Sequence, residues 1–211
     1  MTIPPLRPSA QAVDDLLPQT ECRQCGFDGC AAYAQAIADG LAPINRCAPG
    51  GARGIAELAR ITGLPVVELD TEYGTEQPFA RAVIRAGECI GCSWCVRACP
   101  TDAIVGSPKH LHAVLEDRCT GCSLCAPACP MDCIDFVEAG RDWTREDAKT
   151  AKLHHEETWS RRIKLAALED ERLARRREAA SGAPVDAAAA AAKKKNFMAD
   201  ILAQARAKAR H

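Results

Sequence analysis

The chain has 211 residues, enough for one or two small domains with extensions, and its formal net charge is −1. Aromatic residues make up only 4 % of the sequence, too few to bury a stable core along its whole length. This composition excludes a large conventional hydrophobic core, and we expect bound cofactors to supply the missing stability.

The 13 cysteines all lie before residue 134, and their number is odd. No secretory signal is visible in residues 1–20, and no apolar run approaches the ~20 residues of a membrane span. We therefore expect a cytoplasmic protein without a transmembrane segment, in which thiols stay reduced. Clustered cysteines then indicate metal or redox chemistry and not a disulfide framework.

Charge is divided unevenly along the chain. Residues 1–140 contain 10 Lys and Arg against 17 Asp and Glu, whereas residues 141–211 contain 17 against 11. An acidic half with all the cysteines is thus followed by a basic half without any, which indicates two different roles.

The N-terminal part contains four cysteines and two expected helices. A polar, Pro-rich lead-in (1–19) precedes a domain over residues 20–65, which contains Cys22, Cys25, Cys30 and Cys47. A helix is predicted over residues 31–39, ending before Gly40, and a second over residues 54–63. Residues 66–79 are predicted to form a short extended piece and a linker. The spacing C-x2-C-x4-C-x16-C fits zinc as well as an iron–sulfur cluster.

Residues 80–139 form an internal repeat with a period of 30 residues. The stretch "ECIGCSWCVRACPTDAI" falls on "RCTGCSLCAPACPMDCI", so that four cysteines, a proline and an aspartate recur. Such a repeat predicts two copies of one structural unit. Strand patterns flank the two units, at residues 82–86 and 103–106 and at 112–116 and 134–138. Between each cysteine run and its second strand there is room for one short helix.

The repeated spacing C-x2-C-x2-C-x3-C-P is that of bacterial ferredoxins with two [4Fe–4S] clusters. Three closely spaced thiolates hold three corners of one cluster, and the cysteine before the proline reaches the other cluster. Zinc ribbons use pairs of C-x2-C across longer gaps and do not need this third or fourth cysteine. The predicted ligands of cluster 2 are Cys89, Cys92, Cys95 and Cys129, and those of cluster 3 are Cys99, Cys119, Cys122 and Cys125.

These two clusters also guide the interpretation of the first four cysteines. A protein that already carries two low-potential clusters gains an electron entry or exit point from a third cluster, and gains nothing obvious from zinc. Gly26 and Gly29 let the backbone turn tightly around the ligands and offer amide hydrogens to the sulfurs. We therefore predict three [4Fe–4S] clusters, with cluster 1 bound by Cys22, Cys25, Cys30 and Cys47.

Two further residues of the repeat differ between the units. Cys133 occupies the position of Ala103, and we expect a small buried residue beside a cluster, with a redox-reactive thiol as the alternative. Trp94 occupies the position of Leu124, where it either shields a cluster from water or packs as an ordinary apolar residue.

Residues 140–180 combine strong helix formers with dense charge of both signs, which predicts one long, solvated helix. Residues 181–186 break it, and an Ala/Lys-rich tail (181–211) follows, with a short amphipathic helix from Asn196. The expected fold class is therefore α+β. It comprises a small helical 4Fe–4S domain, a ferredoxin-like domain with pseudo-two-fold symmetry (80–139), a long charged helix and a flexible basic tail.

A family resemblance is carried by residues 17–51, "LPQTECRQCGFDGCAAYAQAIADGLAPINRCAPGG". This stretch resembles the four-cysteine cluster domain in the B subunit of Rnf-type electron-transport complexes (RsxB). A two-cluster ferredoxin domain follows it in that family, as it does here, so the resemblance covers roughly residues 10–140. It implies that all twelve cysteines assigned above are ligands. It also implies electron transfer inside a membrane complex that couples ferredoxin–NAD redox chemistry to ion translocation.

The sequence contains no nucleotide-binding glycine motif and no convincing nucleophile–base pair, so no bond-making active site is expected. We predict a relay of single electrons through three clusters, as the B subunit of an Rnf-type translocase, in the cytoplasm or on the cytoplasmic face of the inner membrane. Expected partners are a redox donor, a redox acceptor and other subunits of the complex. The alternative is a free, soluble ferredoxin-like carrier. A structural or nucleic-acid-binding protein braced by its clusters is disfavoured, because bracing needs one inert cluster, whereas the ferredoxin repeat provides two adjacent centres suited to electron transfer. The tail also lacks stacking aromatics for nucleic-acid binding.

Overall fold

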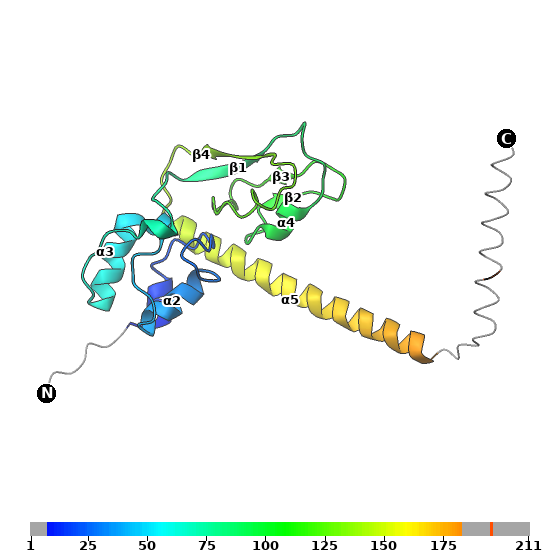
Figure 1. The fold of residues 1–211 in the computed structure, drawn as a ribbon, viewed down its shortest axis with the longest axis horizontal. Helices are drawn as coiled ribbons and strands as arrows, with labels where there is room; N and C mark the ends of the chain where they lie inside the picture. Colours follow the sequence, from blue (N-terminus) through cyan, green and yellow to red (C-terminus); the bar gives the residue numbers. More distant parts are fainter. Residues whose placement is uncertain (1–7, 183–194, 196–211) are drawn as a thin grey trace. The chain divides into compact units, whose positions relative to one another are not determined.

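The structure is a computed structural model that describes residues 8–182 and 195. The chain divides into two compact units, residues 1–161 and 162–211. All cysteines lie in the first unit, which consists of a helical part and a part built on two small sheets (Figure 1). In the second unit, the described residues are Lys195 and the later turns of helix α5 (Arg145–Gly182), whose side chains are mostly exposed. This mixture of helices and small sheets agrees with the expected fold class in its coarse form.

The helical part contains α1 (Ala10–Asp14), α2 (Cys30–Ala38) and α3 (Gly51–Thr62). A short 3-10 helix, η1 (Ala48–Gly50), lies between α2 and α3, and a second, η2 (Thr71–Tyr73), follows α3. Both predicted helices are present, and α3 begins three residues earlier than expected. The stretch expected to be a loose lead-in contains α1, because Val13 is fully buried in the core.

One buried tyrosine fixes the loop that leads to Cys47. Tyr33, only 1 % exposed, lies on α2 in the core of the helical part. Its hydroxyl donates a hydrogen bond to the carbonyl oxygen of Pro43 (2.7 Å) and accepts one from the amide of Arg46 (3.0 Å). A buried hydroxyl with both partners satisfied holds residues 43–46 in one conformation. The position of Cys47 relative to α2 follows from this contact.

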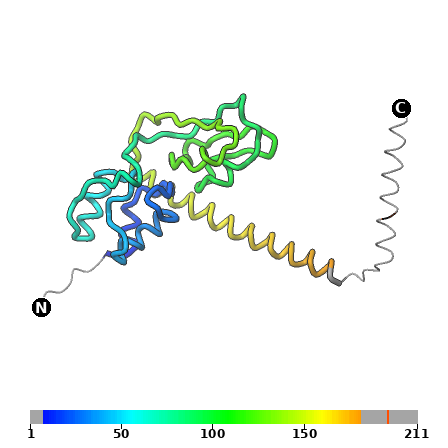
Figure 2. Tube along the Cα trace, viewed as in Figure 1, coloured from blue at the N-terminus to red at the C-terminus, as the bar shows by residue number. Residues whose placement is uncertain are grey.

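The ferredoxin-type part contains two antiparallel two-stranded sheets. Strand β1 (Ala80–Ile84) pairs with β4 (Ile134–Glu138), with Ala82 opposite Phe136. Strand β2 (Ile104–Val105) pairs with β3 (Ala113–Val114), with Ile104 opposite Val114. Figure 2 shows how the chain returns so that the last strand lies beside the first. All four strands overlap the predicted patterns, and their inward side chains form a core with the cysteines.

The predicted short helix of each repeat unit was placed wrongly. In the first repeat unit the helix is α4 (Trp94–Ala98), which lies inside the cysteine run and not after it. The second repeat unit has only turns over the equivalent residues 124–128. The amide of Arg97 donates to the carbonyl of Ser93 at 3.3 Å, whereas Pro127 at the equivalent position has no amide hydrogen. The proline therefore removes a hydrogen bond that the helix of the first unit contains.

Helix α5 begins five residues after the start of the predicted segment (140–180) and ends two residues after its end. A capping box begins it, because the amide of Thr144 donates to Asp147 Oδ2 (2.8 Å) and the amide of Asp147 donates to Thr144 Oγ1 (3.1 Å). The predicted tail helix from Asn196 and most of the chain break at 181–186 lie outside the described residues. Among the described residues, no helix combines the length and the apolar character that a membrane crossing needs.

Candidate iron–sulfur sites

The four cysteines predicted to bind cluster 2 line one cavity, which we call site 2. The cavity has about 300 Å³, including its open mouth, and apolar side chains form much of its wall. Cys89, Cys92 and Cys95 come from the loop after β1 and the start of α4, and Cys129 comes from the second repeat unit. His112 and Cys133 also line this cavity.

A second cavity of about 300 Å³, site 3, is lined by the cysteines predicted to bind cluster 3. Cys119, Cys122 and Cys125 come from the second repeat unit, and Cys99 comes from the first. Each cavity therefore receives three thiols from one unit and one thiol from the other. This exchange is the arrangement that the ferredoxin spacing predicts.

The two units repeat their backbone conformation as well as their sequence. Gly91 and Gly121 both have positive φ, 68° and 69°, and the serines two residues further on have φ of 62° and 61°. A Cβ at Gly91 would lie 2.5 Å from the amide nitrogen of His110, and a Cβ at Gly121 would lie 2.5 Å from the carbonyl oxygen of Ala80. Glycine is required at both positions, so each loop after the first cysteine of its unit passes close to another backbone segment.

The first four cysteines lie together in the helical part, and we call them site 1. Cys25 and Cys30 are buried, and Cys22 and Cys47 are partly exposed. Burial raises the pKa of the Cys30 thiol well above its ordinary value, and the nearby charges of Glu21, Cys47 and Cys22 raise it further. Burial also raises the pKa of Cys47 to about 12, again with Cys22 and Cys25 as charged neighbours. The four sulfurs are thus close enough to influence one another's ionisation.

The thiol chemistry fits an iron–sulfur cluster at each site. Burial raises the pKa of Cys122 and Cys125 in site 3 to about 12, and it raises that of Cys95 in site 2. Such thiols become thiolates when a bound cationic centre compensates their buried negative charge. Thiolates are soft ligands, and iron–sulfur clusters are among the metal centres that such ligands favour. In residues 8–182 and 195, no three His, Cys, Asp or Glu side chains form a group that could hold a single metal ion.

Comparison with known proteins agrees with these sites. Residues 82–136 match the family of 4Fe-4S dicluster domains, and residues 17–49 match a family described as "Putative Fe-S cluster". The B subunit of the ion-translocating oxidoreductase complex of Hahella chejuensis is 53 % identical over 139 residues, which cover 64 % of this chain and 70 % of that protein. The corresponding B subunit from Alkalilimnicola ehrlichii is 54 % identical over 137 residues, covering 64 % and 73 %.

The chain belongs to the family of ion-translocating oxidoreductase complex B subunits. The resemblance to Rnf-type B subunits is thereby confirmed. The match to the B subunit of Thiobacillus denitrificans, 49 % identical over 110 residues, covers 52 % of this chain and 58 % of that protein. The chain therefore matches less than two thirds of the length of some of its relatives.

In this member of the B-subunit family, the cysteine loops of sites 1 and 3 touch each other. Thr120, next to Cys119, donates a hydrogen bond from its buried hydroxyl to the carbonyl oxygen of Thr20 (3.0 Å), two residues before Cys22. Nearby, the indole nitrogen of Trp143 donates to the carbonyl oxygen of Pro18 (2.8 Å). The cysteine loop of site 3 therefore contacts the helical part.

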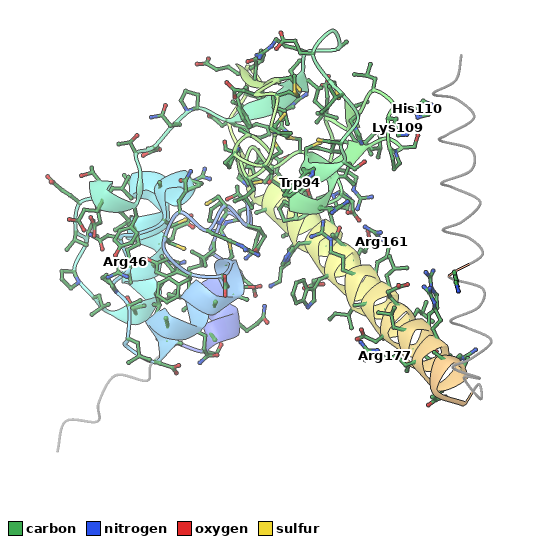
Figure 3. The ribbon with its side chains drawn as sticks, turned by 45° about the vertical axis from the view of Figure 1, so that its right-hand side comes forward. Arg46, Trp94, Lys109, His110, Arg161 and Arg177 are labelled. Atoms are coloured by element: carbon green, nitrogen blue, oxygen red, sulfur yellow. The ribbon has the colours of Figure 1, made fainter. Side chains whose placement is uncertain are left out.

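The first turns of α5 brace both parts of the first unit. Lys152 forms ion pairs with Asp14 and Asp15 of the helical part. Further along the helix, Glu157 pairs with Arg118 (3.3 Å), and Arg161, labelled in Figure 3, pairs with Asp102. Arg118 and Asp102 each lie within three residues of a cysteine of site 3. Helix α5 and the helical part therefore both contact the ferredoxin-type part near site 3.

Two buried polar residues beside the cysteines were not predicted from the sequence. His112 is 2 % exposed, and its Nδ1 lies 3.9 Å from Cys89 Sγ. Glu21 is 5 % exposed, and its carboxylate accepts the amide hydrogen of Cys30 at 3.4 Å. The 30-residue shift aligns His112 with Ala82, so a comparison of the two units would have drawn attention to it.

Trp94 and Cys133 differ from each other in burial. Cys133 is 3 % exposed, in agreement with the expectation of a small buried residue, and its Sγ lies 3.5 Å from Cys129 Sγ. Trp94 is 58 % exposed on α4, so much of its side chain is open to solvent. Its capacity to shield a cluster from water is correspondingly small.

Proposed function

We propose that this chain relays single electrons through three [4Fe–4S] clusters, as the B subunit of an ion-translocating oxidoreductase complex. The observation that carries the proposal is the pair of cavities, each lined by three thiols from one repeat unit and one from the other. When bound, a [4Fe–4S] cluster takes up and releases one electron. The protein binds, orients and partly desolvates the three sites.

The ligand sets that we propose are those of sites 1, 2 and 3. The amide of Ala103 donates to Cys99 Sγ (3.2 Å) and the amide of Ala82 donates to Cys119 Sγ (3.5 Å), which supports thiolates as the bound form at site 3. At site 1, the family match over residues 17–49 supports an iron–sulfur cluster in preference to zinc. We also propose domains at 20–65 and 80–139, with residues 66–79 as the linker; the family matches over residues 17–49 and 82–136 overlap these two domains.

The contacts between the parts support an order for the relay. The loops of sites 1 and 3 meet at the Thr120–Thr20 hydrogen bond. Sites 2 and 3 share one core and exchange one cysteine each. Electrons then pass between site 1 and site 2 by way of site 3, in the order 1–3–2 or its reverse. The helical part and the surface of site 2 are the two ends of the relay.

Partners at these ends are a redox donor and a redox acceptor, one of them another subunit of the complex. We place the chain at the cytoplasmic face of the membrane that holds the complex. Affinity purification of the tagged chain from solubilised native membranes tests this setting, and we expect other subunits of the complex to co-purify. A chain recovered only from the soluble fraction, without such subunits, would favour the free ferredoxin-like carrier.

The cluster count is tested by iron and acid-labile sulfide in anaerobically purified protein. Three clusters predict about twelve of each per chain. A variant with Cys25→Ala and Cys30→Ala removes two ligands of site 1, and we expect it to retain about eight. Equal iron content in this variant and the natural sequence would contradict a cluster at site 1.

A further inference from the structure

Sites 2 and 3 are formed by two copies of one repeat. Residues that differ at equivalent positions of the two repeat units therefore show how the surroundings of the two sites differ. The 30-residue shift pairs His112 with Ala82 and Cys133 with Ala103. His112 and Cys133 line the cavity of site 2, and the two alanines line the cavity of site 3. Two polar side chains therefore face site 2 at positions where site 3 has methyl groups.

The imidazole of His112 lies between two groups of the site 2 loop. Its Nδ1 is 3.9 Å from Cys89 Sγ, and its Nε2 is 3.1 Å from Ser93 Oγ. A ligand thiolate has no proton to donate, so Nδ1 carries the hydrogen in this contact. Nε2 is then the acceptor, and the Ser93 hydroxyl donates to it. A Cβ at Gly106 would lie 2.5 Å from His112 Cδ2, so the missing side chain there makes room for the ring.

Cys133 makes the equivalent contact to the other end of the ligand set. Its side chain is buried, and its Sγ lies 3.5 Å from Cys129 Sγ. Because Cys129 as a ligand is a thiolate, the thiol of Cys133 is the donor in this pair. Site 2 thus receives side-chain hydrogen bonds at two of its four sulfurs.

Site 3 has two threonine hydroxyls near its thiols, and the proton of each is already committed. Thr120 lies beside Cys122, and its hydroxyl donates to the carbonyl oxygen of Thr20 (3.0 Å). Thr101 Oγ1 lies 3.7 Å from Cys99 Sγ, but this hydroxyl donates its only hydrogen to the carbonyl oxygen of Arg118 (2.8 Å). Cys99 instead accepts the backbone amide of Ala103, and burial dominates the environment of Cys122 and Cys125. Around site 2, by contrast, Ile90 and Met131 of the cavity wall are 56 % and 43 % exposed.

We propose that His112 and Cys133 donate hydrogen bonds to Cys89 and Cys129 and thereby raise the reduction potential of cluster 2 above that of cluster 3. Hydrogen bonds to ligand sulfur stabilise the reduced cluster, which carries one more negative charge, and solvent near the cluster acts in the same direction. The proposal rests on the proposed three-cluster function. In the relay order 1–3–2, the electron is then favoured on the site farthest from the helical part.

An anaerobic redox titration of the full chain, followed by electron paramagnetic resonance, tests the proposal. The variant with His112→Ala and Cys133→Ala gives site 2 the residues of site 3. We expect the double variant to lower the reduction potential of cluster 2, the higher of the two potentials in the ferredoxin-type part. The equilibrium constant for reduction of this cluster should fall about tenfold, which corresponds to about 59 mV for one electron. The other midpoints should stay unchanged. The matched control His110→Ala removes an exposed imidazole two residues away and should shift none.

A rescue separates hydrogen bonding from packing. His112→Gln keeps an N–H donor at this position and should restore part of the shift that His112→Ala causes. Unchanged midpoints in the double variant, at the iron content of the natural sequence, would overturn this inference and leave the proposed function intact. If His112→Ala loses cluster 2, Cys133→Ala alone still removes one proposed donor and should lower the same midpoint, and an unchanged midpoint in that variant would overturn the inference. Protein of natural sequence without redox-active clusters would overturn the proposed function itself.

Discussion

The thiols around each site are held by residues whose backbone conformations leave little choice of side chain. Gly91 is the clearest case, because its φ is 68° and a Cβ there would lie within 2.6 Å of both the amide nitrogen and the carbonyl oxygen of His110. The amide of Lys109 donates to the carbonyl oxygen of Gly91 at 2.9 Å, so the two segments cannot separate without losing a hydrogen bond.

Gly91→Ala should therefore open the site 2 loop and release its cluster. We expect the iron content to fall from about twelve to about eight per chain, since the other two sites keep their ligands. Gly87→Ala is the control, because a Cβ there meets no atom within 4 Å. Full iron content in Gly91→Ala would show that the close approach of the two segments is not needed for binding.

At this scale the sequence predicts the cysteines but not their neighbours. Ligand spacing is local, so the pairing of Cys129 with the first three cysteines follows from the repeat. The contact of His112 with Cys89 joins residues 23 positions apart, and nothing in their local sequence indicates it. Burial of Glu21 is similarly set by α2 and by α5, whose His155 Nδ1 lies 3.8 Å from its carboxylate.

At the scale of elements, the start of α5 determines how the helix braces the first unit. Asp147 accepts hydrogen bonds from the amide and hydroxyl of Thr144 (2.8 and 2.7 Å) and from two guanidinium nitrogens of Arg141 (2.7 and 2.9 Å). Hydrogen bonds from Arg141 and Thr144 hold the pKa of Asp147 well below its ordinary value. A carboxylate with a lowered pKa stabilises the folded state wherever the unfolded chain still carries its charge.

Asp147→Asn should lower the free energy of unfolding by about 1–2 kcal/mol at pH 7. The contribution of the carboxylate is fully present above the unfolded pKa of about 3.9 and is lost as the pH falls below it. The difference between the variant and the natural sequence should therefore be constant from pH 5 to 8 and narrow below about pH 4. Denaturant unfolding at each pH measures it, with Asp142→Asn as an exposed control. A difference that persists unchanged at pH 3 would contradict the assignment.

Secondary structure followed the sequence where the signal was local. The strands, α2, α3 and the long helix were predicted because their hydrophobic or charge patterns repeat within a few residues. The short helices were placed wrongly: α4 lies inside the cysteine run of the first repeat unit, and in the second repeat unit Pro127 lacks the amide hydrogen that Arg97 donates to Ser93. The bracing of both parts by α5 was not predicted, since its ion pairs with Asp14 and Asp102 join residues far apart in the chain.

For the whole molecule, the relay order 1–3–2 makes a prediction about distances between clusters. In fully reduced protein, the spin of cluster 3 should couple magnetically to the spins of clusters 1 and 2. Cys119→Ala with Cys122→Ala removes cluster 3, and the two remaining spins should then appear uncoupled in electron paramagnetic resonance spectra. The matched variant without site 1, Cys25→Ala with Cys30→Ala, should keep the coupling between clusters 2 and 3. Strong coupling between clusters 1 and 2 in the absence of cluster 3 would refute this order.

The central claim, that the chain holds three one-electron centres, is tested most directly by counting electrons. Anaerobic titration of the purified full chain with a low-potential reductant, followed by the bleaching of its visible absorbance, gives the number of electrons accepted per chain. Three [4Fe–4S] clusters predict an end point of about three electrons. An end point of about two would remove the cluster at site 1, and a chain that accepts none would contradict the relay altogether.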